Sequence, residues 1–289
     1  MTATRLSTTQ RAGAPVLLAL DGRAGTAGAI RVAEALSRRH GNDIHVTTVL
    51  EPLPLYLSGM DLYPDERATN RVVRAREDVG HRIQVVLGRE YAWPVEVVGG
   101  HVPDALAAAA DHDNVTAIVI GIGHHHTVDR VLGDETSLHI ATRSTMPVIA
   151  VPEWVTTLPH NAVVGTDFGE SSHGAARAAL DCLAAPGVLT LLHVAPTFDP
   201  LLTGRVDGLS YRDAVSDLFA SMIDRLDVPP GIEIKTARLS GSPAEAMIAY
   251  AKRIDADLMG VGKHGGGTVA AELLRAAQCM VIIAPARRD

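Results

Sequence analysis

Short apolar runs alternate along the chain with longer segments in which apolar residues recur every three or four positions. In the first half, the apolar runs lie near Val16, Ile44, Val95, Ala117 and Val148. The segment after the first run carries Ala29, Ala33 and Leu36 at helical spacing, which predicts an amphipathic helix. Because most of the runs are continuous rather than alternating, we expect strands that are buried on both faces of a parallel sheet.

The second half of the chain repeats this order of strands and helices. A run ending in aspartate, a strand ending in valine and a helix beginning with proline each occur twice, at Asp21 and Asp167, Val49 and Val194, and Pro103 and Pro243. Internal repetition of this kind predicts two domains with one fold. The expected division is a tail over 1–14, a first domain over 15–152, a linker over 153–161 and a second domain over 162–289.

Each domain is expected to be α/β, a doubly wound five-stranded parallel sheet with helices on both faces, which is a Rossmann-like arrangement. In such sheets, ligands bind at the carboxyl ends of the strands, where the strand order reverses. Three features of each half fall there: the aspartate after the first strand, the end of the second strand, and a glycine-containing loop after the fourth. These features predict a ligand site in each domain.

The loop in the second half is rich in glycine, from Gly260 to Thr268. Glycines let main-chain N–H groups approach an anion closely, and the helix that follows, from Val269 to Arg275, adds a favourable dipole. We expect Thr268 to cap that helix, and Lys263 to add positive charge near a phosphate. The spacing formally matches the dinucleotide fingerprint, but it follows the fourth strand and lacks the later acidic residue, which disfavours NAD. A tight turn without ligand remains the alternative.

These motifs together resemble the universal stress protein family, twice over and along nearly the whole chain. The resemblance lies in Thr166-Asp167-Phe168, His193-Val194, Gly241 to Ala246, Ala256 to Leu258 and Gly262 to Gly265. It implies a fold like that of the adenine nucleotide alpha hydrolases. It also implies a bound adenine nucleotide, ATP, ADP or AMP, with or without Mg²⁺. Asp167 and Val194 would then hold ribose and adenine.

The resemblance implies specific nucleotide-binding residues in each half. In the second half they are Thr166, Asp167, Val194, Val261, Gly262, His264, Gly265, Gly267 and Thr268. In the first half they are Asp21, Val49, Gly121, Gly123 and Gly133.

Both loops depart from the family's G-x2-G-x9-G-S/T pattern. In the second half only Gly266 separates Gly265 from Gly267, so a mono- or diphosphate should fit as well as a triphosphate. In the first half, the loop is long, from Gly123 to Gly133, but Asp134 takes the Ser/Thr position. A carboxylate there repels phosphate. We therefore expect the main site in the second domain, and a first site that is weak, empty or dependent on a bridging metal.

Composition narrows the classes of partner. The formal net charge of −7 disfavours nucleic acid or an anionic membrane, and no apolar run reaches the roughly 18 residues of a membrane helix. Two cysteines without metal-ligand spacing and a polar N-terminus favour a reduced, cytoplasmic protein. The histidines from His124 to His126 are interpreted as solvated loop residues, and Ser171-Ser172-His173 as a helix start. No catalytic or metal-binding residues are therefore predicted.

The sequence thus favours a stress-response regulatory protein that binds an adenine nucleotide and is not an enzyme, with slow ATPase activity left open. An unidentified regulatory protein would read the bound state. The alternative is a nucleotide-free interaction module with degenerate sites. The resemblance implies a homodimer through the closing strands near Val148 to Val151 and Val281 to Ile283, although these two edges could instead pair within one chain.

Overall fold

The protein, seen in a computed structural model, is an alternation of strands and helices, described over residues 13–21, 25–52, 64–122, 129–195, 208–263, 267–276 and 278–286. The first half has strands β1 (Val16–Ala19), β2 (Ile44–Leu50), β3 (Val95–Gly99), β4 (Ala117–Ile122) and β5 (Val148–Pro152). Its helices are α1 (Ala27–His40), α3 (Pro64–Leu87), α4 (Val102–His112) and α5 (Asp129–Arg143).

The second half follows the same order. Its strands are β6 (Asn161–Gly165), β7 (Gly187–Ala195), β8 (Ile232–Ser240), β9 (Leu258–Gly262) and β10 (Met280–Ala284). Its helices are α6 (Glu170–Cys182), α8 (Gly208–Asp224), α9 (Pro243–Arg253) and α10 (Thr268–Ala276). The alternation predicted from the apolar runs is confirmed in both halves.

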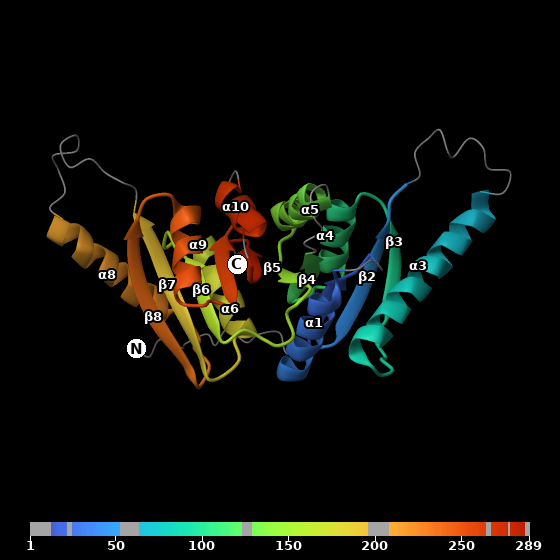
Figure 1. Ribbon diagram of the computed structural model, residues 1–289, viewed down its shortest axis with the longest axis horizontal. Helices are drawn as coiled ribbons and strands as arrows, with labels where there is room; N and C mark the ends of the chain where they lie inside the picture. The colour runs from blue at the N-terminus through green and yellow to red at the C-terminus, as the bar shows by residue number, and fades with distance from the viewer. Residues whose placement is uncertain are drawn as a thin grey trace, which may run out of the picture.

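The ten strands form one sheet, in the order β3-β2-β1-β4-β5-β10-β9-β6-β7-β8 (Figure 1). Within each half all pairs are parallel and the strand order is the doubly wound one that the sequence predicts. The halves meet through β5 and β10, which pair antiparallel with Ala150 opposite Val281. The closing strands therefore pair within one chain, so the homodimer expected through them has no free closing edge to use.

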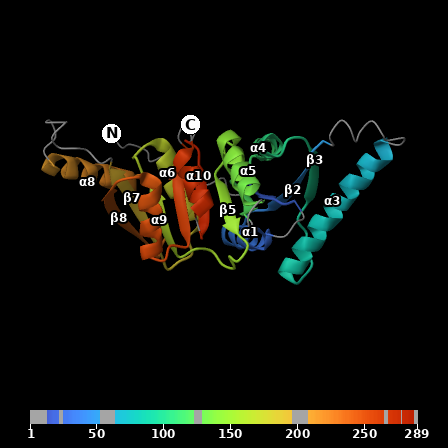
Figure 2. The ribbon, with the colours of Figure 1, turned by 45° about the horizontal axis from the view of Figure 1, so that its top comes forward.

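Helices cover both faces of the sheet, and each covered face has one continuous core. Because side chains alternate along a strand, Leu18 and Val164 face α1, α3, α6 and α8, whereas Leu17 and Val163 face α4, α5, α9 and α10. Each core contains residues of both halves, and α5 contacts α10 across the junction (Figure 2). The two halves therefore share their hydrophobic cores.

Polar contacts between the ends of α1 and α6 also join the two halves. Arg39 Nη1 donates to the carbonyl of Leu183, and His40 Nε2 lies 2.8 Å from the carbonyl oxygen of Asp181. Both side chains come from the last turn of α1, and both carbonyls lie at the end of α6. Basic side chains are favourable beside the carbonyls that end a helix.

Helices α1 and α6 lie very close to the strands at the junction. In α1, a Cβ atom added at Gly28 would overlap the carbonyl oxygen of Pro152 at the end of β5. In α6, a Cβ added at Gly174 would come within 2.9 Å of the carbonyl oxygen of Pro285, just after β10. Only glycine permits this approach of helix to strand backbone.

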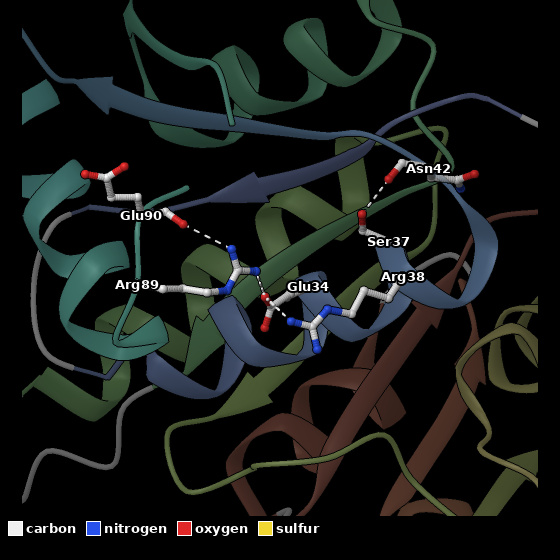
Figure 3. A network of polar contacts seen from close by, with 6 residues as sticks. All are labelled: Glu34, Ser37, Arg38, Asn42, Arg89 and Glu90. Atoms are coloured by element: carbon white, nitrogen blue, oxygen red, sulfur yellow. Dashed lines mark hydrogen bonds and ion pairs between the residues drawn. The ribbon is translucent and has the colours of Figure 1, made fainter. Parts of the chain in front are cut away.

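A polar network holds α1 against the chain that follows α3 (Figure 3). Glu34 accepts hydrogen bonds from Arg38, at 2.8 Å, and from Arg89. At the end of α1, the chain turns through Gly41, whose φ of 68° favours glycine. The Ser37 hydroxyl donates to the Asn42 carbonyl at 2.5 Å and closes that turn.

Candidate functional site

Three strand ends of the second half meet at one edge of the sheet. Strand β6 is hydrogen-bonded to β7 on one side and to β9 on the other, and all three are parallel. Thr166 and Asp167, which follow β6, therefore lie between Val194 near the end of β7 and Gly262 at the end of β9. These four predicted residues share the edge of the sheet where the strand order reverses.

A compact turn after β6 fixes the position of Asp167. The main-chain N–H of Phe168 donates to Thr166 Oγ1 at 2.8 Å, and that of Gly169 donates to Asp167 Oδ1 at 3.1 Å. Thr166 Oγ1 is also 3.0 Å from Ser172 Oγ, in the first turn of α6. Thr166 is buried, whereas Asp167 is exposed at the sheet edge. The turn thus presents a carboxylate to solvent with its orientation fixed by local bonds.

Aromatic rings gather beside this turn, which the sequence analysis did not predict. Phe168 adopts a φ of 67°, in the left-handed region that few bulky residues occupy. Its ring centroid lies 4.9 Å from that of His193 and 5.0 Å from that of Phe219 in α8. A chain with 3% aromatic residues offers no periodic pattern that would have revealed this cluster.

Hydrogen bonds determine the tautomer of His193. Its Nδ1 lies 2.9 Å from the Thr166 carbonyl oxygen, which can only accept, so Nδ1 carries the proton. In the neutral ring, Nε2 then accepts from the hydroxyl of Tyr211, 3.0 Å away. His193 therefore links the end of β6 to the first turns of α8, on the face of the sheet opposite α9 and α10.

Glycine at the end of the fourth strand of each half has a packing role. A Cβ at Gly262 would lie 2.5 Å from the carbonyl carbon of Ser171, and one at Gly121 would lie 2.8 Å from the carbonyl oxygen of Gly25. The helix after the first strand, α1 or α6, therefore starts in contact with the last residues of the fourth strand in both halves. Val261 is buried in the core shared with α9 and α10, so only its main chain is available at the edge.

Lys263, which the sequence analysis expected to add positive charge near a phosphate, contacts a helix of the other half. Its Nζ donates to the main-chain carbonyl of Ser144, 3.4 Å away in the first half, just after α5. Its own main-chain N–H donates to the Ala284 carbonyl at 2.6 Å. The ammonium is held by the carbonyl end of α5, because that end of a helix carries partial negative charge.

The end of the glycine loop differs slightly from the prediction. Helix α10 begins at Thr268 rather than Val269, so Gly267 precedes the helix in the place that the sequence analysis gave to Thr268. Gly267 has a φ of 59°, which favours glycine. Thr268 is exposed, with its main-chain N–H in the first turn of α10. His264 and Gly265 lie outside the described residues.

Four of the five residues predicted for the first-half site lie within the described ranges. Asp21 is exposed after β1, Val49 is half-buried near the end of β2, and Gly121 lies in β4. Gly123 lies outside the described residues. The loop expected to reach Gly133 is shorter, because α5 begins at Asp129 and includes Gly133, at a cost of only about 1 kcal/mol for a helical glycine.

The serines and histidine at the start of α6 serve the helix itself. The Ser172 hydroxyl donates to the Gly169 carbonyl at 2.9 Å, which matches the predicted helix start. His173 is buried, and its Nε2 has no hydrogen-bond partner within the described structure. Burial, together with the charges of Arg225 and Arg177, lowers the pKa of His173, although Glu170 opposes this. The imidazole is therefore neutral at neutral pH.

Comparison with known proteins identifies the family of the chain. A family model described as the universal stress protein family matches residues 14–152 and again residues 159–285. The chain belongs to the universal stress protein family. It is a tandem member, since the model matches twice. No curated protein matches the chain.

Solved structures support the universal stress protein fold over the full length. A universal stress protein from Archaeoglobus fulgidus is 17% identical, with a TM-score of 0.65, and the match covers 95% of this chain and 97% of that one. A functionally unknown protein from Pseudomonas aeruginosa is 14% identical, with a TM-score of 0.62, covering 96% and 94%. A family protein from Arabidopsis thaliana, with AMP bound, covers 44% of this chain and 92% of its own, at 19% identity and a TM-score of 0.31.

The remaining features of the described part of this universal stress protein concern metal-binding groups, membrane-spanning helices and cysteines. Over the described ranges, no group of three or more His, Cys, Asp or Glu side chains could hold a metal ion; His124 to His126 lie outside those ranges. No helix within the described part of the chain is long and apolar enough to cross a membrane. Both cysteines are free, and burial raises the pKa of the Cys279 thiol to about 12.

Proposed function

We propose that this protein binds an adenine nucleotide in its second half and acts by binding rather than by catalysis. One observation carries the proposal: the exposed Asp167 carboxylate lies between the ends of β7 and β9, where parallel sheets bind ligands. Membership of the universal stress protein family supports the choice of ligand. The role is that of a cytoplasmic stress-response regulator.

Each part of the proposed site has a matching chemical task. Asp167 accepts hydrogen bonds from ribose hydroxyls, and the main chain at Val194 contacts the adenine edge. The main-chain N–H groups around Gly267 and Thr268, at the start of α10, take the phosphates, since that end of a helix attracts anions. Gly262 and the main chain of Val261 form the floor. Thr166 acts indirectly, by holding the turn.

The first half is proposed as the weaker site. Its aspartate, Asp21, is exposed at the matching position. However, Thr26, at the start of α1, accepts a hydrogen bond from Arg82 Nε at 3.3 Å, and Arg82 also pairs with Glu153 at 3.2 Å. The equivalent hydroxyl in the second half, Ser172, instead supports the turn that holds the site's aspartate. Val49, Gly121, Gly123 and Gly133 remain predicted contacts of this weaker site.

Calorimetric titration with ATP, ADP and AMP tests the proposal, with and without Mg²⁺. We expect saturable binding that Asp167→Ala reduces at least tenfold and that Asp21→Ala, the matched change in the first half, leaves nearly intact. Equal losses in the two variants would contradict the assignment to the second half. No binding of any of the three nucleotides to the unmodified protein would reject the proposal.

Two further measurements separate the alternatives. A co-purified nucleotide in the native mass spectrum of fresh protein would contradict the reading as a nucleotide-free interaction module. Multiple-turnover phosphate release from ATP that is lost in Thr268→Ala would show catalysis. We expect no such turnover, because the Ser172 hydroxyl is bonded to a carbonyl and His173 is buried.

A further inference from the structure

Both ends of the loop that follows β9 rest on α5, a helix of the other half. At the start of the loop, Lys263 Nζ donates to the Ser144 carbonyl at 3.4 Å. At its end, Gly267 lies so close to Leu138 that an added Cβ would be 3.3 Å from Leu138 Cδ1. Leu138 lies within α5, and Ser144 directly follows it. Two independent contacts thus join the loop to one helix.

The contact between the Lys263 ammonium and the end of α5 is electrostatically favourable. The main-chain N–H of Ser144 donates to the Ile140 carbonyl at 2.8 Å, so the helical turn continues to Ser144. The carbonyls in this last turn carry the partial negative charge of the helix end, and a lysine ammonium stabilises them. Lys263 is therefore oriented by α5 before any ligand arrives.

The first half has no equivalent contact at the matching position. Gly121 and Gly262 both meet the start of the helix after the first strand, so the residues that follow them correspond. In the first half that residue is Ile122, which is buried and apolar. An isoleucine cannot donate to a helix end. At this position, therefore, a helix of the N-terminal half contacts the residue after the fourth strand of the C-terminal half, without an equivalent contact in the opposite direction.

We propose that α5 is a positioning element of the nucleotide site in the second half, and that Lys263 and Leu138 are positioning residues. The proposal rests on the proposed function and deepens it: the N-terminal half, whose own site departs more from the family pattern, holds in place Lys263 after β9 and Gly267 before α10 in the C-terminal site. Losing either contact lets the main-chain N–H groups near Gly267 move away from their binding orientation.

The test compares Lys263→Met and Leu138→Ala with the unmodified full-length protein. Lys252→Met is the matched control, because Lys252 is an exposed lysine of α9 in the same half and the same charge is removed. Two quantities are measured well below the unfolding temperature: the ADP dissociation constant by calorimetry, and hydrogen–deuterium exchange of peptides covering residues 258–276 without nucleotide. The exchange measurement needs no ligand.

We expect ADP to bind about fivefold more weakly in Lys263→Met and in Leu138→Ala, the size expected for losing one modest contact. Exchange near Gly267 should be faster in both variants and unchanged in Lys252→Met. Because Leu138 carries no charge, its effect cannot arise from direct contact with phosphate.

Unchanged exchange in both variants would overturn the proposal. So would weaker ADP binding in Lys263→Met alone, with exchange as in the unmodified protein, because Lys263 would then act directly on the ligand. Faster exchange in both variants, in a protein that binds no adenine nucleotide, would uphold the support by α5 and reject only the proposed function.

Discussion

The contact of α1 with the end of β5 predicts that a single methyl group at Gly28 destabilises the protein. In Gly28→Ala, the new Cβ would overlap the Pro152 carbonyl oxygen and approach its carbonyl carbon to 3.0 Å and Val151 Cγ1 to 3.1 Å. The obstacle is main chain in a paired strand, at the junction of the two halves. It cannot rotate away as a side chain can, so α1 must shift.

The expected magnitude combines two opposing effects. Alanine favours a helix interior over glycine by about 1 kcal/mol. Overpacking of a tight core costs about 1–3 kcal/mol, and the rigid obstacle places Gly28→Ala at the upper end. The free energy of unfolding should therefore fall by about 1–2 kcal/mol, which lowers the melting temperature by roughly 2–8 °C in a protein of this size.

Gly80→Ala in α3 is the matched control. It is the same change inside a helix, but the added Cβ would meet only the hydroxyl of Tyr91, at 2.8 Å, which is the movable end of a side chain. We expect unchanged stability or a gain of up to about 1 kcal/mol. Urea unfolding followed by circular dichroism measures both variants. Gly28→Ala as stable as Gly80→Ala would refute the close approach of α1 to β5.

Three other predictions concern single side chains. Burial lowers the pKa of His173 below its unfolded value, so the unfolded chain binds the proton more readily and the free energy of unfolding should fall as pH drops below about 6.5. In urea unfolding at pH 5–7, His173→Gln should weaken this dependence of the free energy of unfolding on pH, and the exposed control His139→Gln should not. Burial raises the pKa of Cys279 to about 12 and that of Cys182 further, so less than one thiol per chain should react with a thiol reagent at pH 8 before unfolding; rapid reaction of either would contradict the raised pKa of these thiols. Glu34→Gln should lower the free energy of unfolding by about 1 kcal/mol, because the carboxylate accepts from two arginines; a calorimetric melting temperature equal to that of the unmodified protein would argue against this network.

The order of elements could be derived from the chain itself. Continuous apolar runs predict buried parallel strands because such strands are covered on both faces, and the helical spacing of Ala29, Ala33 and Leu36 predicts the buried face of α1. The repeated strand ends at Asp21 and Asp167 indicated two similar halves. Such signals are local, since each depends on residues that are neighbours in the sequence.

Only the tertiary structure decided how distant residues meet. The sequence allowed the closing strands to pair within or between chains, and the antiparallel contact of Ala150 with Val281 resolves this. Nothing in the sequence around Lys263 predicts that the end of α5, from the other half, contacts its ammonium. Apolar periodicity says which face of an element is buried, whereas the direction of a polar side chain depends on which carbonyl or carboxylate another part of the chain brings within reach.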